Sequence, residues 1–386
     1  MSIIPGVGEA IRSQFPIFQS KTFCDTCSKG ALSLRVEAAL QEYLESWKAL
    51  GSPWGLWTEK MEELRSAFAS LIGAKSDEVA VTSSVSAALN FLASALEHKG
   101  RPKVVVTELE FPTVLQIWHA QARLGAEVQH VVASDNDIPL SAFERAIDER
   151  TLLVSATHVC YRTGAKLRIP ELQELCHQKG TYLMLDSYQS TGTMSVNVKE
   201  WDLDFMVTGC LKYLLGPSGV ALFYVREDLI EGLEPVCSGW FARTEPFDYH
   251  IYEAEYSSTA RRFQAGTPSI PGVYGALAGL KTIQEVGLER IEAHVARLTK
   301  ALIKGAVELG LDLITPLEDY RRGPLVVIRA KEVEQLVQRL ADRGIIASSR
   351  DDGLRISLHL YNTLDDVEFI LDALRENRSL LATRQA

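Results

Sequence analysis

Three groups of residues in this sequence could do chemistry together. Ser84 and Ser86 follow a short apolar run and begin a helical pattern, where free backbone N–H groups can hold an anion. Asp186 ends another apolar run, and a buried carboxylate there needs a cationic partner. Lys212 lies among apolar neighbours, where loss of water lowers the pKa of the amine and makes it nucleophilic. Taken singly, each is better explained by a helix cap, a salt bridge or a solvated lysine.

The combination matches the needs of one cofactor, pyridoxal 5'-phosphate: a phosphate site, a partner for the pyridinium nitrogen and an amine that forms a Schiff base. The sequence resembles the class V aminotransferase superfamily of fold-type I pyridoxal phosphate enzymes. This superfamily contains cysteine desulfurases, kynureninases and isopenicillin N epimerase-like proteins. The resemblance extends from about Phe23 to Leu371, with the motifs in the family's order.

The resemblance implies roles for residues around the cofactor ring. Lys212 would form the Schiff base and act as the catalytic base, and Asp186 would keep the ring nitrogen protonated. Gln189 would hydrogen-bond the phenolic oxygen of the ring. Phe111, in Glu-Phe-Pro-Thr, stands where the family places the residue that stacks on the cofactor, a position at which kynureninases have Phe and desulfurases have His.

The resemblance also implies a phosphate site, a shared active site and a substrate anchor. Val85, through its N–H group, and Ser86 would hold the phosphate. Thr267 and Trp240 match residues that reach the phosphate from the neighbouring subunit, so the resemblance implies a homodimer with shared active sites. Arg355, in Leu-Arg-Ile-Ser-Leu-His, matches the arginine that binds the substrate carboxylate, and a guanidinium can make two parallel hydrogen bonds to such a group.

Departures from the family patterns bear on the reaction. Cysteine desulfurases have a catalytic cysteine shortly before the arginine, but residues 345–355 contain none and the last cysteine is Cys237. Kynureninases usually have Tyr before the lysine and Asp after Phe-Pro-Thr, whereas this chain has Leu211 and Val114. Where kynureninases have Asn-Pro, this chain has Thr267-Pro268. Ser-Gly-Trp-Phe and Tyr-Arg-Thr-Gly at 161–164 nevertheless resemble the kynureninase side of the family.

We therefore expect a pyridoxal phosphate enzyme that acts on an α-amino acid through a Schiff base and a carbanion at Cα. The favoured reaction is a lyase or kynureninase-like cleavage. An aminotransferase or an amino-acid epimerase of the same family uses the same Lys, Asp and Arg and stays an alternative. A more distant alternative is a non-catalytic pyridoxal phosphate-binding regulatory or partner protein.

The elements that must position these residues can be read from the apolar pattern. Near-continuous apolar runs alternate with amphipathic helical segments, which predicts an α/β fold with a mainly parallel, mixed seven-stranded sheet covered on both faces. The last two runs lack a helix between them, which indicates a hairpin. The runs lie at 79–82, 103–108, 127–132, 151–159, 182–187, 204–209 and 219–225.

A second pattern begins after the sheet. Helices are expected at 31–49 and 57–72 before it, and one helical stretch at about 272–309 after it. Two further strands and two helices then indicate a smaller C-terminal α+β domain. We predict an N-terminal segment at 1–60 that contributes to the small domain and the active-site entrance, a large cofactor-binding domain at 61–285 and a small domain at 286–386.

Composition restricts the partners and the location. The 386 residues have 40 Lys and Arg against 50 Asp and Glu, a net charge of −10, which argues against nucleic acid as a partner. No apolar run is long enough to span a membrane, and the N-terminus lacks the pattern of a signal peptide, so we expect a cytoplasmic protein that does not bind membranes. Six scattered cysteines fit a reducing compartment.

Other motifs carry less weight. Cys24 and Cys27 form a single CxxC pair without the second half of a zinc site, and the histidines show no metal-binding spacing, so we expect no metal. Gly6 and Gly8 begin an incomplete GxGxxG with no strand before it. Trp54 and Trp57 could equally be core residues or walls of a substrate pocket.

Overall fold

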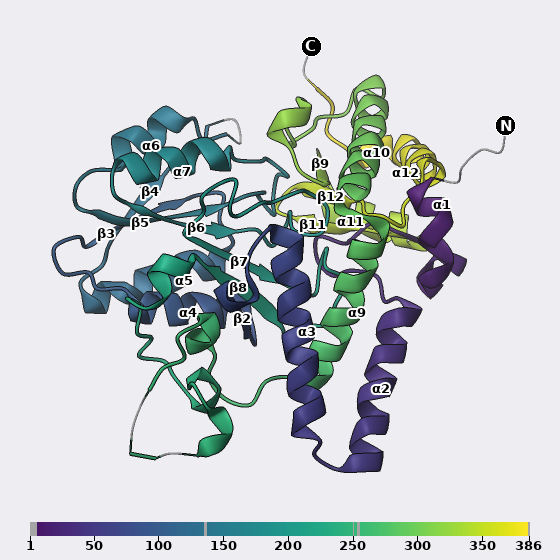
Figure 1. Ribbon diagram of the computed structural model, residues 1–386. Helices are drawn as coiled ribbons and strands as arrows, with labels where there is room; N and C mark the ends of the chain where they lie inside the picture. Colours follow the sequence, from purple (N-terminus) through teal and green to yellow (C-terminus); the bar gives the residue numbers. More distant parts are fainter. Residues whose placement is uncertain (1–5, 135–136, 250, 253–254, 385–386) are drawn as a thin grey trace.

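The computed structural model describes residues 6–134, 137–249, 251–252 and 255–384 (Figure 1). Its central feature is a seven-stranded sheet with the strand order β2-β8-β7-β6-β5-β3-β4. The strands are β2 (Val79–Thr82), β3 (Lys103–Thr107), β4 (Glu127–Val131), β5 (Thr151–Thr157), β6 (Tyr182–Asp186), β7 (Phe205–Gly209) and β8 (Ala221–Val225). The neighbouring pairs β4-β3, β3-β5, β5-β6 and β6-β7 are parallel, and β8 is antiparallel to β7 and β2. The predicted mixed, mainly parallel sheet is confirmed, as is the antiparallel pairing of the last two runs.

Helices cover both faces of this sheet, which explains why its strands are apolar on both sides. Val104 and Val106 pack in one buried cluster with α4 (Val85–Ala95) and α5 (Pro112–Ala120). Val105, between them, faces the opposite cluster, which α3, α6 and α7 complete. Figure 1 shows α6 and α7 on one side of the sheet and α4 and α5 on the other. The bounds of the second group are α3 (Trp54–Ile72), α6 (Leu140–Ala146) and α7 (Ile169–Gln178).

The topology brings three strand ends to one edge of the sheet. Because β8 is antiparallel to both β2 and β7, β2 points in the same direction as β6 and β7. The carboxyl ends of these strands are Thr82, Asp186 and Gly209. Ligands of open α/β sheets bind outside the carboxyl ends of the strands. This edge is therefore the place to look for a site.

The C-terminal part forms a smaller α+β unit with its own buried cluster. Its antiparallel sheet has the order β11-β12-β9, and β10 pairs in parallel with β1 from the N-terminal segment. The elements are β1 (Thr22–Phe23), β9 (Leu325–Arg329), β10 (Ile345–Ile346), β11 (Ser348–Arg350), β12 (Gly353–Ser357), α10 (Leu288–Glu308), α11 (Val333–Asp342) and α12 (Leu364–Glu376). The strands β1, β10 and β11, which have two or three residues each, are not indicated by the sequence pattern.

The expected single helical stretch at about 272–309 is wrong in one respect. The structure has two helices there, α9 (Ile270–Val286) and α10, separated by Gly287. The φ angle of Gly287 is +91°, a conformation that glycine adopts readily and that ends an α-helix. The break between the two helices therefore lies next to the predicted domain boundary at 285/286.

The N-terminal segment contacts both parts of the chain. After α1 (Val7–Ile11), Arg12 forms an ion pair with the buried Asp366 at 2.6 Å, and Cys24 lies in the C-terminal cluster. Next comes α2 (Leu34–Leu50), capped by Ser33, which packs against α9 and lies beside α3 in Figure 1. The short α8 (Glu227–Ile230) follows β8. Among the described residues, no helix combines the length and the apolar content needed to cross a membrane.

Candidate active site

A cavity of about 310 Å³ lies at the carboxyl edge of the large sheet. It brings together residues from strand ends and loops that are far apart in the sequence. Six of the nine residues predicted for the site line it: Val85, Ser86, Phe111, Asp186, Gln189 and Lys212. Arg355 lies directly behind the wall, whereas Trp240 and Thr267 lie elsewhere in this chain, as described below.

Lys212 lies in the loop between β7 and β8, and its backbone is fixed by neighbouring hydrogen bonds. Gly30 N–H donates to the oxygen of Leu211 at 2.8 Å, and Leu215 N–H donates to the oxygen of Lys212 at 3.1 Å. Desolvation lowers the pKa of the Lys212 amine to about 8, although the nearby Asp186 acts in the opposite direction. A neutral amine is the nucleophilic form, so this site makes that form accessible near neutral pH.

Asp186 is the last residue of β6 and is 4% exposed. The N–H group of Tyr188 donates to its Oδ1 at 2.9 Å. Burial raises the pKa of the Asp186 carboxyl, while the Tyr188 N–H group and Lys212 act to lower it. A buried carboxyl with one hydrogen bond and a raised pKa can stabilise a cation placed next to it.

Gln189 reaches the cavity from the turn after β6. Its Nε2 donates to the backbone oxygen of Cys27 at 3.1 Å, and its Oε1 is buried without a hydrogen-bond partner. An amide nitrogen carries two hydrogens, so one donor is left for an acceptor in the cavity. The side chain therefore has unused hydrogen-bonding capacity on the cavity side.

The start of α4 forms a second polar part of the cavity. Ser84 caps the helix, because its Oγ accepts a hydrogen bond from Ala87 N–H at 3.0 Å. Val85 and Ser86 follow in the first turn, where backbone N–H groups have no partner within the helix. The structure thus combines the ordinary capping role of Ser84 with an anion-binding helix terminus at Val85 and Ser86.

Phe111 is the residue before α5, and its ring is 44% exposed at the cavity. The ring meets that of Tyr161 edge to face, with a centroid distance of 5.0 Å. Lys212 Nζ lies 5.8 Å from the centroid of the Phe111 ring. The aromatic face is therefore available for a flat ligand next to the lysine.

Arg355 lies in β12 of the C-terminal unit and is 1% exposed. Its Nη2 donates to the hydroxyls of Ser28 and Ser348, each at 2.8 Å, and its Nη1 donates to the backbone oxygen of Tyr161 at 3.2 Å. These partners are uncharged, and Ser28 and Tyr161 themselves line the cavity. The guanidinium thus places a buried positive charge behind this wall.

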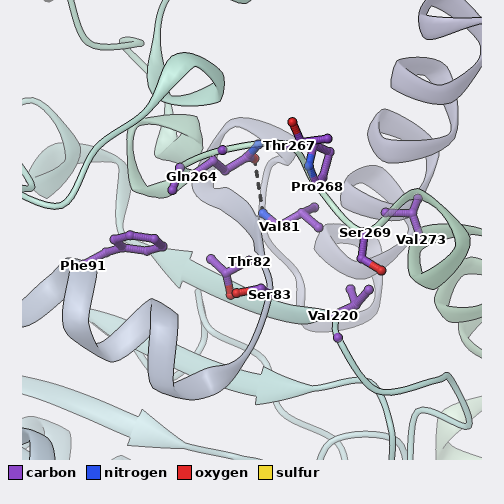
Figure 2. A pocket seen from close by; sticks show the side chains of 13 residues that line it. Val81, Thr82, Ser83, Phe91, Val220, Gln264, Thr267, Pro268, Ser269 and Val273 are labelled. Carbon is purple, nitrogen blue, oxygen red and sulfur yellow. Dashed lines mark hydrogen bonds between the residues drawn. The ribbon is translucent and has the colours of Figure 1, made fainter. Parts of the chain in front are cut away.

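Thr267 and Trp240 do not reach the Lys212 cavity within this chain. Thr267 lines a separate pocket of about 100 Å³ together with Ser83 and Gln264, as Figure 2 shows. Trp240 packs edge to face on Trp54 at 5.7 Å and on Phe241 at 4.4 Å. A role for either residue in a partner's site stays a prediction.

Trp54 and Trp57 belong to the packing of the large domain. Trp57 is buried in the core and donates from Nε1 to Ser46 Oγ at 3.1 Å. Trp54 packs against this cluster, and neither indole lines the Lys212 cavity. Of the two interpretations that the sequence left open, the structure favours the core.

Sequence reasoning missed four residues at or beside the site. Ser28, Tyr161 and Tyr188 line the cavity, and Glu110 lies close enough to Asp186 to interact with it electrostatically. Burial, followed by the charge of Asp186, raises the pKa of the Glu110 carboxyl well above its usual value, and both of its oxygens lack hydrogen-bond partners. Two signals could have indicated them: Tyr188 and Glu110 adjoin predicted residues, and Tyr161 begins the Tyr-Arg-Thr-Gly motif.

Among the described residues, the cysteines and histidines give no second site. Cys24 and Cys27 are both buried and free. Within the part of the chain that the structure describes, no group of three or more His, Cys, Asp and Glu side chains could hold a metal ion.

The residues that line the cavity have the chemical groups needed to bind pyridoxal phosphate. Asp186 is a buried carboxyl suited to a pyridinium nitrogen, and Gln189 has a free donor for a ring oxygen. The first turn of α4 suits a phosphate, and Lys212 is an amine of lowered pKa in the same cavity.

Comparisons with known proteins agree with this fit. Residues 30–370 match the family model "Aminotransferase class-V". The uncharacterized aminotransferase YcbU of Bacillus subtilis is 36% identical over 94% of this chain and 96% of its own length. The kynureninase of Bacillus anthracis is 31% identical over 92% of this chain and 88% of its own length.

A solved structure supports the same assignment. The apo cysteine desulfurase from Thermococcus onnurineus superposes with a TM-score of 0.89 at 27% identity, covering 98% of this chain and all of that one. The fold is thus that of fold-type I pyridoxal phosphate enzymes, as predicted. The chain belongs to the class-V aminotransferase family, and it is an enzyme whose cofactor is pyridoxal phosphate.

Proposed function

We propose that this enzyme removes the proton from Cα of an α-amino acid and then cleaves a bond at Cβ, as a lyase or in a kynureninase-like reaction. The observation that carries the amino-acid substrate and the proton removal at Cα is the joint placement of Lys212, Asp186 and the buried Arg355 around one cavity. Cleavage at Cβ is favoured by the motifs at 161–164 and 238–241, which resemble those of kynureninases. These groups provide an amine, a partner for a cation and an anchor for a carboxylate. An α-amino acid presents the complementary amino and carboxylate groups.

Five residues would hold the cofactor besides Lys212. Asp186 would pair with the ring nitrogen, Gln189 would donate to the phenolic oxygen, and Phe111 would cover one face of the ring. The first turn of α4, at Val85 and Ser86, would bind the phosphate. When bound, pyridoxal phosphate supplies an electron sink for the charge that develops at Cα.

The remaining steps rest on the chain's own side chains. Arg355 would bind the substrate carboxylate in two parallel hydrogen bonds and so fix the orientation of Cα. Lys212, with its pKa near 8, would accept the Cα proton as a general base, since a base with a pKa near the working pH is both available and strong enough. Asp186 would keep its negative charge next to the ring nitrogen throughout.

Transamination is the second candidate, and one observation favours it. The relative that is 36% identical is described as an aminotransferase, whereas the kynureninase that favours cleavage is 31% identical. Both reactions begin with the same proton transfer to Lys212. They differ in where the next proton or leaving group goes, which the shared residues do not determine. A desulfurase reaction is disfavoured, because residues 345–355 contain no cysteine.

A product panel tests the proposal. The purified holoenzyme is incubated separately with the common amino acids, with kynurenine and with keto-acid acceptors. Anthranilate, ammonia, sulfide and new keto acids are then measured, with Lys212→Ala as the matched inactive control. Products of Cβ cleavage without an added keto acid support the proposed reaction. Turnover that requires a keto-acid acceptor would replace it with transamination, and no turnover with any substrate would contradict both.

Two further parts of the proposal concern assembly and location. We expect a homodimer in which Thr267 and Trp240 of one subunit complete the other's phosphate site. We also expect a cytoplasmic enzyme with neither nucleic acid nor membrane as a partner, and its net charge of −10 disfavours nucleic acid.

A further inference from the structure

Tyr188 lies beneath Lys212 and has no role in the reaction proposed above. It lies two residues after Asp186, to which its N–H group donates, and its ring lines the cavity. Lys212 Nζ lies 4.3 Å from the centroid of the Tyr188 ring, closer than the 5.8 Å that separates it from Phe111. At this distance the ring face attracts a positive charge. The amine therefore lies close to two aromatic rings.

Gly209, the last residue of β7, makes room for the Tyr188 ring. A Cβ atom at Gly209 would lie 2.1 Å from both Cζ and Oη of Tyr188, far inside van der Waals contact. Any other residue at this position would therefore force the tyrosine ring to move. Tyr188 and Gly209 are thus sterically matched, and the match determines where the ring lies relative to Lys212.

We propose that Tyr188 is a positioning residue for the Lys212 amine. Because Gly209 has no side chain, the Tyr188 ring fits against it with its face toward Nζ. The proposal rests on the proposed role of Lys212 as the amine that binds the cofactor. The ring contributes in two ways. Its bulk excludes water from one side of Nζ, and its negative face attracts the ammonium form. Only the second effect needs an aromatic side chain.

The charged and titratable groups around Nζ must be kept constant to isolate this effect. Asp186 and Cys27 favour the ammonium form of Lys212, while Arg355 and Arg350 disfavour it. Desolvation outweighs these charges. Variants confined to Tyr188 leave all four groups in place, so a difference between two variants of similar bulk reports the aromatic face alone.

The experiment compares Tyr188→Phe with Tyr188→Leu in the full-length protein. Pyridoxal phosphate is added to each apoenzyme, and the rate of covalent binding is followed by absorbance from pH 6 to pH 10. Borohydride reduction and peptide mapping identify the modified lysine. The cofactor's own titrations are common to all three proteins, so the difference in the midpoint of the profile reports the amine.

Tyr188→Phe keeps the ring and should keep the wild-type midpoint. Tyr188→Leu keeps apolar bulk but loses the ring face, so its midpoint should fall by roughly half a unit to one and a half units, because the ammonium form loses its aromatic contact. Gly209→Ala, which displaces the ring without altering Tyr188, should change the midpoint in the same direction.

Three results would overturn the proposal. A wild-type midpoint in Tyr188→Leu would show that the ring does not act on the amine. A shift in Tyr188→Phe equal to that in Tyr188→Leu would assign the effect to the hydroxyl. An unchanged midpoint in a folded Gly209→Ala protein would show that the steric match is irrelevant. If the wild-type protein itself carries the cofactor on another lysine, the proposed role of Lys212 fails instead, which peptide mapping distinguishes.

Discussion

The guanidinium of Arg355 donates a hydrogen bond to the backbone oxygen of Tyr161 at 3.2 Å, and this contact connects the C-terminal unit to the cavity wall of the large sheet. The same guanidinium binds the hydroxyl of Ser28 from the N-terminal segment. Three separate parts of the chain thus meet at one buried positive charge. Because its partners are neutral, that charge can interact strongly with an incoming carboxylate.

Arg355→Lys tests this role. Lysine keeps the charge but cannot make two parallel hydrogen bonds, so the change should cost about 1.5 to 3 kcal/mol of transition-state binding. This corresponds to a fall in kcat/KM of roughly tenfold to more than a hundredfold, which steady-state kinetics measures. The cofactor spectrum should not change.

The exposed Arg350 offers a matched control for this experiment. Arg350→Lys removes a guanidinium from the neighbouring strand β11 but keeps its positive charge at an exposed position, so kcat/KM should stay within about twofold. Unchanged efficiency in Arg355→Lys, or loss of the cofactor spectrum, would show that Arg355 has a different role.

Lys212→Ala should reduce turnover by orders of magnitude while the fold remains, since the nucleophile and the base are lost together. Circular dichroism and thermal unfolding check the fold, and a product assay checks turnover. Lys300→Ala changes an exposed lysine and should behave like the wild type. Cofactor mass found on any peptide other than that containing Lys212 after borohydride reduction would reject the assignment.

The pH dependence of cofactor capture follows from the lowered pKa of Lys212. Below about 8 the amine is mainly protonated, so the rate of covalent binding should rise with pH and then level off above that value. Well below the midpoint, the neutral fraction changes tenfold per pH unit. A midpoint near the ordinary lysine value of about 10.4 would show that burial does not act on this amine.

The sequence predicts residues that line the cavity best where they lie at the end of a strand. Buried strands of a parallel sheet are apolar throughout, so Asp186 was conspicuous at the end of such a run, and the order of motifs placed Lys212 and Gln189 with it. The strands β1 and β10 were not predicted, because strands of two residues are too short to show a periodic pattern. Gly287 was visible as a residue, but its positive φ angle, which ends α9, cannot be read from the residue type alone.

The missed residues depend on contacts between distant segments. Ser28 reaches the cavity only because the N-terminal segment packs on the C-terminal unit, and no local pattern indicates that packing. Glu110 is a charged residue in a polar-looking loop, yet the fold buries it beside Asp186. Tyr188 adjoins predicted residues, but its ring fits under Lys212 only because Gly209 has no side chain.

The steric match between Tyr188 and Gly209 also predicts coupled stabilities. Gly209→Ala should destabilise the protein by about 1 to 3 kcal/mol, the range for overpacking, because the new methyl group overlaps the tyrosine ring. The same change in a Tyr188→Ala background should cost much less, since the space is then empty. Urea unfolding of the four proteins measures the coupling. Equal costs in both backgrounds would contradict the match.

Sharing of the active site between subunits can be tested by complementation. One chain carries Lys212→Ala, and the other carries Thr267→Ala with Trp240→Ala. If each site takes Lys212 from one chain and Thr267 and Trp240 from the other, a heterodimer contains one intact site and one doubly defective site. Random mixing of the two chains then gives about half heterodimers, and hence about a quarter of wild-type activity, as expected for a two-fold symmetric dimer.

The measurement uses two different affinity tags, so that the heterodimer is isolated and its activity determined per site. The parent homodimers, refolded and mixed in the same way, provide the baseline. Thr267 and Trp240 do not line the Lys212 cavity within one chain, so a contribution from either residue requires a neighbour. An isolated heterodimer with no more activity than its parents would show that the site is complete within a single subunit.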